Sequence, residues 1–83
     1  EGRLAGYALA TARDGHGELE SLYLESEARR GGLGSELARR AIDWMRERGS
    51  TRITLSVAAG NEGVLPFYES LGFRLRRLQL ELV

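Results

Sequence analysis

The stretch LYLESEARRGGLGSELARRAIDWMRER, residues 22–48, contains the two signals that decide the fold. The first is a helix in its second half, where apolar residues recur at a spacing of four: Leu33, Leu37, Ala41 and Met45. This spacing predicts an amphipathic helix from Leu33 to Arg48, with Gly49 as its stop signal. The second is the cluster of glycines and arginines directly before that helix.

The residues before and after this stretch alternate as strands do. Arg3 to Ala12 is small and apolar on both sides, and Asp14 to Gly17 supplies residues that suit a hairpin turn. Glu18 to Leu24 is then the returning strand, and Ile53 to Val57 a third strand. A regular period of two places Glu18, Glu20, Leu22 and Leu24 on one face of the returning strand.

A second helix and a final strand follow. Asn61 is a candidate N-cap, Pro66 fits only near the first turn, and Gly72 ends this helix. Between Leu75 and Leu78 the apolar alternation changes phase. One strand with a bulge or two short strands explain this equally well. The order β-β-α-β-α-β, with a further β if two strands form, predicts an α/β fold with a mixed, mostly antiparallel sheet flanked by helices.

Length and composition limit the classes of protein. The chain has 83 residues, 12 basic against 12 acidic side chains, a formal net charge of zero and no cysteine. We therefore expect a single domain over residues 1–83, no nucleic-acid partner, and no metal site built on thiolates. Because no apolar run approaches the ~18 residues of a membrane span, we expect a cytoplasmic protein without a membrane partner. The first residue is Glu1, so we expect the domain to be incomplete at its N-terminus.

The glycine cluster suggests a phosphate site. Glycines let backbone N–H groups approach a ligand, and the first-turn amides of a helix lie at the positive end of its dipole. A phosphate loop of the Gly-Lys-Ser/Thr type is excluded because the chain has no lysine, and the dinucleotide fingerprint is excluded because Leu37 occupies the third glycine position. The alternative interpretation is a plain strand-to-helix turn with solvated arginines.

The same residues resemble the acetyl-CoA site of the GNAT superfamily of N-acetyltransferases. The signature Arg/Gln-x-x-Gly-x-Gly/Ala is matched by Arg29 to Gly34, after a strand that ends in Leu22-Tyr23-Leu24. The second marker, Asn, a short helix with Phe-Tyr, then Leu-Gly-Phe, is matched by Asn61 to Phe73. The family's first strand, the helices after it and most of its second strand have no counterpart, and those elements commonly form the acceptor side of the cleft.

The resemblance implies a cofactor site. It would hold the pyrophosphate on the helix start, the pantetheine arm along the strand edge at Leu22 and Leu24, and further cofactor contacts at Asn61, although N-capping alone also explains that residue. The implied pyrophosphate residues are Arg29, Arg30, Gly31, Gly32, Leu33, Gly34 and Ser35. No metal is implied, and His16, in the predicted turn, is expected at the surface.

The resemblance also implies catalytic residues. Tyr68 matches the general acid that protonates the CoA thiolate, and Glu18 matches the position of a general base in some members, with Glu20 nearby as the other candidate. With no cysteine to carry the acetyl group, the expected reaction is direct attack of a primary amine on acetyl-CoA in a ternary complex.

Other functions remain open at this point. One is an acetyl-CoA-binding sensor without turnover. Another is a vicinal-oxygen-chelate metalloenzyme, which a single histidine disfavours. The amine acceptor is not readable. The superfamily often dimerises, and Leu78 to Val83 is a candidate edge for a homodimer.

Overall fold

The computed structural model describes residues 6–24 and 32–83. Within them lie three strands, one long helix, one short helix and one 3₁₀ turn. Their bounds are β1 Gly6–Arg13, β2 His16–Leu24, α1 Leu33–Glu47, β3 Arg52–Leu55, η2 Glu62–Val64 and α2 Leu65–Ser70. The fold is therefore mixed α/β, as predicted.

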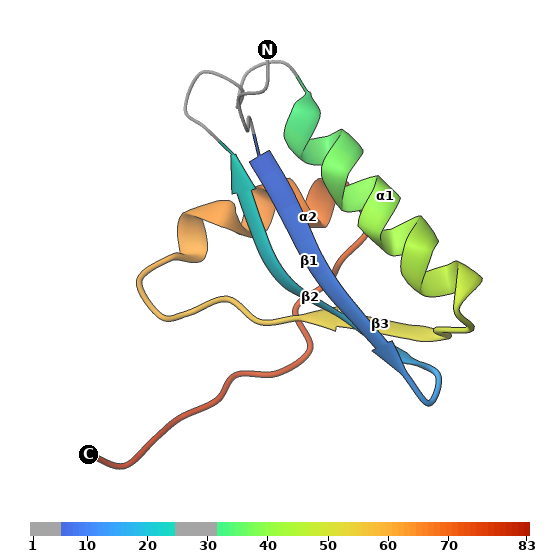
Figure 1. Ribbon diagram of the computed structural model, residues 1–83. Helices are drawn as coiled ribbons and strands as arrows, with labels where there is room; N and C mark the ends of the chain where they lie inside the picture. Colours follow the sequence, from blue (N-terminus) through green and yellow to red (C-terminus); the bar gives the residue numbers. More distant parts are fainter. Residues whose placement is uncertain (1–5, 25–31) are drawn as a thin grey trace.

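The strands form one sheet in the order β1-β2-β3 (Figure 1). β1 and β2 are antiparallel from Gly6↔Leu24 to Arg13↔His16, and β3 is parallel to β2. The hairpin turn consists of Asp14 (φ 54°) and Gly15 (φ 81°), a pair of positive φ values that suits the right-handed twist of the strands. Because the turn needs only these two residues, His16 lies within β2, and its prediction as a turn residue is wrong.

The core lies between the sheet and α1. Its buried members are Leu19 from β2 and Ala38, Ala41 and Met45 from α1. These helix positions include two of the four that the spacing predicted, and the helix ends one residue before the predicted Arg48. Gly49 follows with φ 89°, a conformation that favours glycine and ends the helix.

A close approach fixes α1 against β2. A Cβ atom on Gly17 would lie 2.6 Å from Sδ of Met45 and 2.9 Å from Oγ of Ser50. Only a residue without a side chain allows this contact. The glycine is therefore required for the tight packing of β2 on the helix.

The second helix forms where the sequence predicts it. Pro66 occupies the first turn of α2, where no intrahelical N–H donor is lost. The turn at Gly72 (φ 107°) ends the helix. Figure 1 shows α2 behind β1 and β2, with the chain running on from it to the C-terminus.

The predicted final strand, whether single or double, is wrong for this structure. Residues 73–83 form neither helix nor strand. Leu78, Leu80 and Leu82 are 78%, 94% and 98% exposed, so they pack on nothing. Without a bulge, no single register would bury the apolar residues on both sides of Arg76-Arg77. Figure 1 shows the segment leading away from the body of the molecule.

The returning strand also differs from its prediction. Its pairing with β1 shifts between Leu9 and Ala10, so that Leu19 lies opposite Ala10 and Ser21 opposite Leu9, and Glu20 is the extra residue of a β-bulge. Leu22 consequently shares the core-facing side of Ala8, whereas Glu18 lies opposite Thr11. The prediction that Glu18, Glu20 and Leu22 share one face is therefore wrong.

Candidate functional site

A cleft opens where β2 and β3 separate. The two strands pair only from His16↔Arg52 to Leu19↔Leu55, and the chain beyond Leu55 leaves the sheet. α2 and η2 close the other side of this gap. The residues that line the cleft are Leu19, Glu20, Ser21, Leu22, Leu55, Ser56, Val57, Ala58, Asn61, Val64 and Tyr68.

Along the cleft, one edge of β2 is not paired with another strand. From Glu20 onward β2 keeps β1 on one side but has no pairing with β3 on the other. An edge that is not paired with a further strand can bind an extended ligand through its backbone N–H and C=O groups. Leu22, a predicted contact of the pantetheine arm, lies on this edge and lines the cleft. Leu24 is the last residue of β2.

The start of α1 has amides without an intrahelical acceptor. Gly32 is the N-cap residue, with φ 79°, and no side chain caps the helix. Its carbonyl accepts the first helical hydrogen bond, from the N–H of Glu36 at 3.1 Å. The first-turn N–H groups of Leu33, Gly34 and Ser35 therefore have no intrahelical acceptor, which suits an anion.

Three residues of the predicted pyrophosphate site lie outside the described residues. These are Arg29, Arg30 and Gly31. Of the described members, Gly34 is buried, Leu33 and Ser35 are half-buried, and Gly32 is exposed. The fit to a pyrophosphate thus rests on the uncapped helix start alone.

Tyr68 lines the cleft from α2 and packs on the core cluster of Leu19, Ala41 and Met45. Its ring makes edge-to-face contacts with Phe67 (5.1 Å between centroids) and Phe73 (6.0 Å). Burial raises the pKa of the Tyr68 phenol above its ordinary value. The side chain is held in place and stays protonated at neutral pH, as a proton donor must.

Asn61 precedes the 3₁₀ turn η2 and lines the cleft. It is the N-cap residue by position, as predicted, but its side chain makes no capping hydrogen bond. Its backbone N–H donates to the carbonyl of Ala58 at 3.0 Å, which closes the loop after β3. The position is therefore structural, and the side-chain amide is not used by the cap.

The two candidate bases lie in different places. Glu20 lines the cleft, and Glu18 does not. Glu18 lies opposite Thr54 in the paired half of β2 and β3. Because β3 leaves β2 after Leu19, only Glu20 lines the cleft together with Tyr68 and Asn61.

Several cleft residues were not predicted from the sequence. These are Ser21, Ser56, Val57, Ala58 and Val64. The alternation of Ile53, Leu55 and Val57 predicts a strand through Val57, whereas β3 ends at Leu55. Val57, the last residue of that alternation, therefore lines the cleft instead of pairing in the sheet. This difference follows from the separation of β2 and β3.

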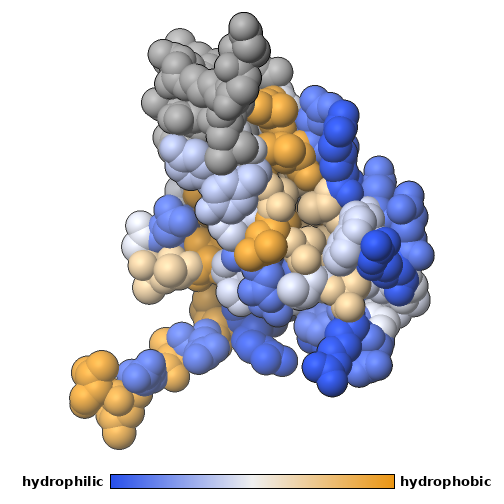
Figure 2. Space-filling model, in the orientation of Figure 1, coloured by the Kyte–Doolittle hydropathy of each residue, from blue (hydrophilic) through white to orange (hydrophobic). Residues whose placement is uncertain are grey.

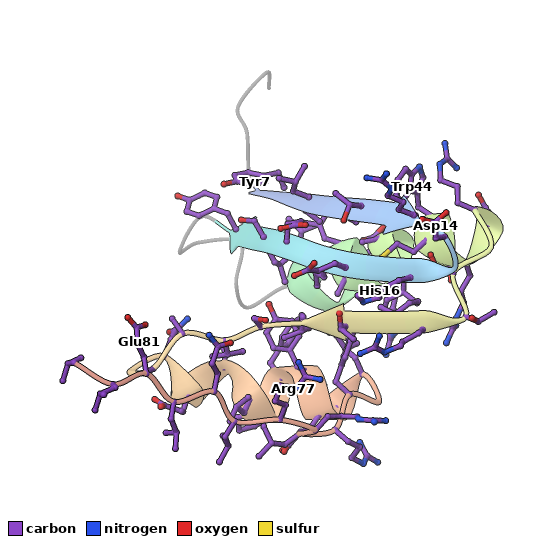
Figure 3. The ribbon with its side chains drawn as sticks, turned by 90° about the horizontal axis from the view of Figure 1, so that it is seen from below. Tyr7, Asp14, His16, Trp44, Arg77 and Glu81 are labelled. Carbon is purple, nitrogen blue, oxygen red and sulfur yellow. The ribbon has the colours of Figure 1, made fainter. Side chains whose placement is uncertain are left out.

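His16 forms a hydrogen bond with a residue outside the cleft. Nε2 of His16 lies 2.8 Å from Oγ1 of Thr54, which links β2 to β3 below the point where they separate. Figure 3 places His16 beside these two strands. Among residues 6–24 and 32–83, no group of three His, Cys, Asp or Glu side chains could hold a metal ion. In the same part of the chain, no helix has the length and apolarity to cross a membrane.

Comparison with known proteins identifies the family. The model described as the acetyltransferase (GNAT) family matches residues 1–73. The chain therefore belongs to the GNAT acetyltransferase family, as its motifs predict.

Individual relatives agree with this assignment. The chain is 36% identical over 63 residues to N-alpha-acetyltransferase 30 of Schizosaccharomyces pombe, a match that covers 75% of this chain and 42% of the relative. It superposes on a putative acetyl transferase from Pyrococcus furiosus with a TM-score of 0.81 at 29% identity, covering 98% of this chain and 58% of that one.

A third protein is the ribosomal-protein-S18-alanine N-acetyltransferase of Escherichia coli. The TM-score is 0.79 at 30% identity, covering 92% of this chain and 49% of that one. The chain thus spans about half the length of each of these three proteins.

Proposed function

We propose that this chain binds acetyl-CoA in the cleft between β2 and β3 and transfers the acetyl group to a primary amine in a ternary complex. The observation that carries the proposal is the juxtaposition of a free strand edge, at Leu22, with Tyr68 across the same cleft. Membership of an acetyltransferase family supports it.

The reaction needs three proton movements. Glu20, at the cleft, first takes one proton from the ammonium, directly or through a water molecule. The neutral amine nitrogen then forms a bond to the thioester carbonyl carbon, and the carbon–sulfur bond breaks. Tyr68 donates its phenolic proton to the departing thiolate, so that CoA leaves as the thiol, and the second proton that the nitrogen loses restores the phenol.

The remaining groups bind the cosubstrate. The uncapped N–H groups of α1 suit the pyrophosphate, with Arg29 and Arg30 as proposed further charges. A backbone N–H near Leu22 would polarise the acetyl carbonyl as its oxygen gains negative charge. Asn61 is a proposed cofactor contact because its side chain is at the cleft and not in a cap.

The first experiment measures thermal stability of the 83-residue chain with increasing acetyl-CoA, with CoA, ATP and NAD as comparisons. A ligand that binds only the folded state raises stability by mass action. We expect acetyl-CoA and CoA to stabilise the chain and the other two to have no effect. Equal stabilisation by all four, or by none, would argue against the site.

The second experiment separates an enzyme from a sensor. A panel of spermidine, a lysine peptide and a peptide with a free N-terminus is incubated with acetyl-CoA, and amide formation is measured. Intersecting initial-rate patterns are expected for a ternary complex, and ping-pong kinetics would contradict direct attack. Binding of acetyl-CoA without acetylation of any amine would instead identify a sensor.

Two broader proposals accompany this function. We expect residues 1–83 to unfold as one domain, in a single transition seen by circular dichroism and tryptophan fluorescence. A cytoplasmic location is proposed on sequence grounds and is tested by cell fractionation.

A further inference from the structure

Glu20 is the extra residue of the β2 bulge. It lies between the pairs Ala10↔Leu19 and Leu9↔Ser21 and has no cross-strand partner of its own in β1. The residue lines the cleft, and its carboxylate contacts a residue of β1 that neither the motifs nor the family match singles out.

That residue is Thr11. Its Oγ1 donates a hydrogen bond to Oε2 of Glu20 at 3.2 Å. Thr11 is β-branched and sits within β1, so its side chain has few rotamers and its backbone is held by the sheet. A rigid donor therefore holds one oxygen of the carboxylate and leaves the other available.

Restraint matters because both side chains are exposed. An exposed glutamate samples many rotamers, and only a few of them direct the carboxylate to an amine at the cleft. Holding a reacting group in one orientation raises the rate because less motion is lost on reaching the transition state.

The neighbouring glutamate lacks this arrangement. Glu18 lies directly opposite Thr11 in the register, but the hydroxyl is bonded to Glu20. Glu18 also lies outside the cleft lining. The two carboxylates, two residues apart, therefore form a matched pair for experiment.

We propose that Thr11 is a positioning residue that orients the Glu20 carboxylate toward the acceptor amine, so that Glu20 and not Glu18 accepts the proton. This inference rests on the proposed function. Thr11 does not touch acetyl-CoA or the reacting atoms; it acts only through Glu20.

The test uses the 83-residue chain, acetyl-CoA and the amine panel above. Thr11→Val removes the hydroxyl and keeps the shape, whereas Thr11→Ser keeps the hydroxyl. We expect Thr11→Val to lower kcat by about tenfold, as one lost hydrogen bond to a charged group would, with the KM for acetyl-CoA unchanged. Thr11→Ser should restore most of the activity.

A double-mutant cycle shows whether Thr11 acts through Glu20. We expect Glu20→Gln to lower kcat by about a hundredfold or more, and Glu18→Gln to change it less than threefold. Adding Thr11→Val to Glu20→Gln should cause no further loss, because the group that Thr11 orients is already neutral. A purely structural role for Thr11 would give additive losses and a lower melting temperature.

Three results would overturn the inference: a larger loss from Glu18→Gln than from Glu20→Gln, additive effects in the cycle, or full activity of Thr11→Val. A chain that binds acetyl-CoA and acetylates no amine would also overturn it, because no proton would need an acceptor. Failure of the proposed function is distinguished from failure of this inference by the thermal-stability experiment. If the proposed function is wrong, acetyl-CoA does not stabilise the unaltered chain. In that case the inference fails with it.

Discussion

The two halves of β2 serve different purposes although they belong to one strand. In the first half, from His16 to Leu19, both edges are paired, with β1 on one side and β3 on the other. In the second half, from Glu20, only the β1 edge is paired, and the other edge lines a cleft. We refer to them as the closed half and the open half.

The difference separates residues that build the core from residues that line the cleft. The closed half contains the buried Leu19 and the glycine against which Met45 packs. The open half contains the exposed Glu20 and a free edge. Substitutions in the closed half should therefore reduce folding stability, and those in the open half should reduce activity while leaving the fold intact.

The largest expected effect is at Met45, which is fully buried and packs on the closed half. Met45→Ala should lower the free energy of unfolding by about 2–5 kcal/mol, because it removes buried apolar surface and leaves a cavity. Urea denaturation followed by circular dichroism measures this. Leu75→Ala is the control, since Leu75 is 65% exposed. Equal losses from the two variants would contradict the assignment of the core.

The next effect concerns Tyr68 of α2, which lines the cleft beside the open half. Tyr68→Phe should lower kcat by about a hundredfold through loss of the proton donor, with little change in stability. Tyr7→Phe, at an exposed ring outside the cleft, is the control. Unchanged turnover in Tyr68→Phe would exclude it as the general acid.

The pH dependence follows from the same residue. Burial raises the pKa of Tyr68 above its ordinary value of 10.0, so the protonated form persists to higher pH than for a free tyrosine. Its contribution to stability is complete below about pH 10 and is lost as the pH rises through the folded-state pKa. A fall in kcat between pH 7 and pH 9 that Tyr68→Phe abolishes would contradict this prediction.

A smaller effect is expected at Gly17, where the closed half meets α1. Gly17→Ala would place a methyl group within 3 Å of Met45 and Ser50, and should destabilise the fold by about 1–3 kcal/mol. Gly63→Ala is the matched control, because a Cβ there has no neighbour within 4 Å. Thermal unfolding of the two variants compares them. If Gly17→Ala were as stable as the control, the close approach of helix and strand would be wrong.

The smallest effect on folding is expected from the terminal segment. Figure 2 shows apolar and polar residues alternating along it, away from the rest of the surface, and Figure 3 labels Arg77 and Glu81 on it. Removal of residues 78–83 should change the free energy of unfolding of the monomer by less than about 0.5 kcal/mol. We propose this segment as the edge of a homodimer, so the same deletion should yield monomers in sedimentation experiments. A dimer that survives the deletion would place the contact elsewhere.

Much of the fold follows from local sequence. The spacing of Leu33 to Met45 predicts α1, the Asp14-Gly15 pair predicts the hairpin, and Pro66 and Gly72 mark the start and end of α2. Each of these signals acts within one or two turns of chain, through side-chain periodicity or allowed backbone angles. They need no knowledge of distant residues.

The candidate site was predictable only in part. Tyr68, Leu22, Asn61 and Glu20 lie at the cleft, as the motif residues imply. The positions of Ser21 and Ser56 in the cleft lining were not predictable, because they depend on where β3 leaves β2. The terminal leucines show that a local pattern can also predict too much. Leu78, Leu80 and Leu82 alternate as in a strand, yet they are exposed because no neighbouring strand pairs with them.

The sequence by itself determined the helices, the hairpin turn and the family, because these depend on residue types at short spacing. Tertiary structure decided which of the two glutamates lines the cleft. β3 pairs with β2 at Glu18 but leaves it after Leu19, so Glu20 borders the cleft and Glu18 does not. The one-residue bulge, which arises from the pairing of β1 with β2, decided that Leu22 lies on the other face from Glu18.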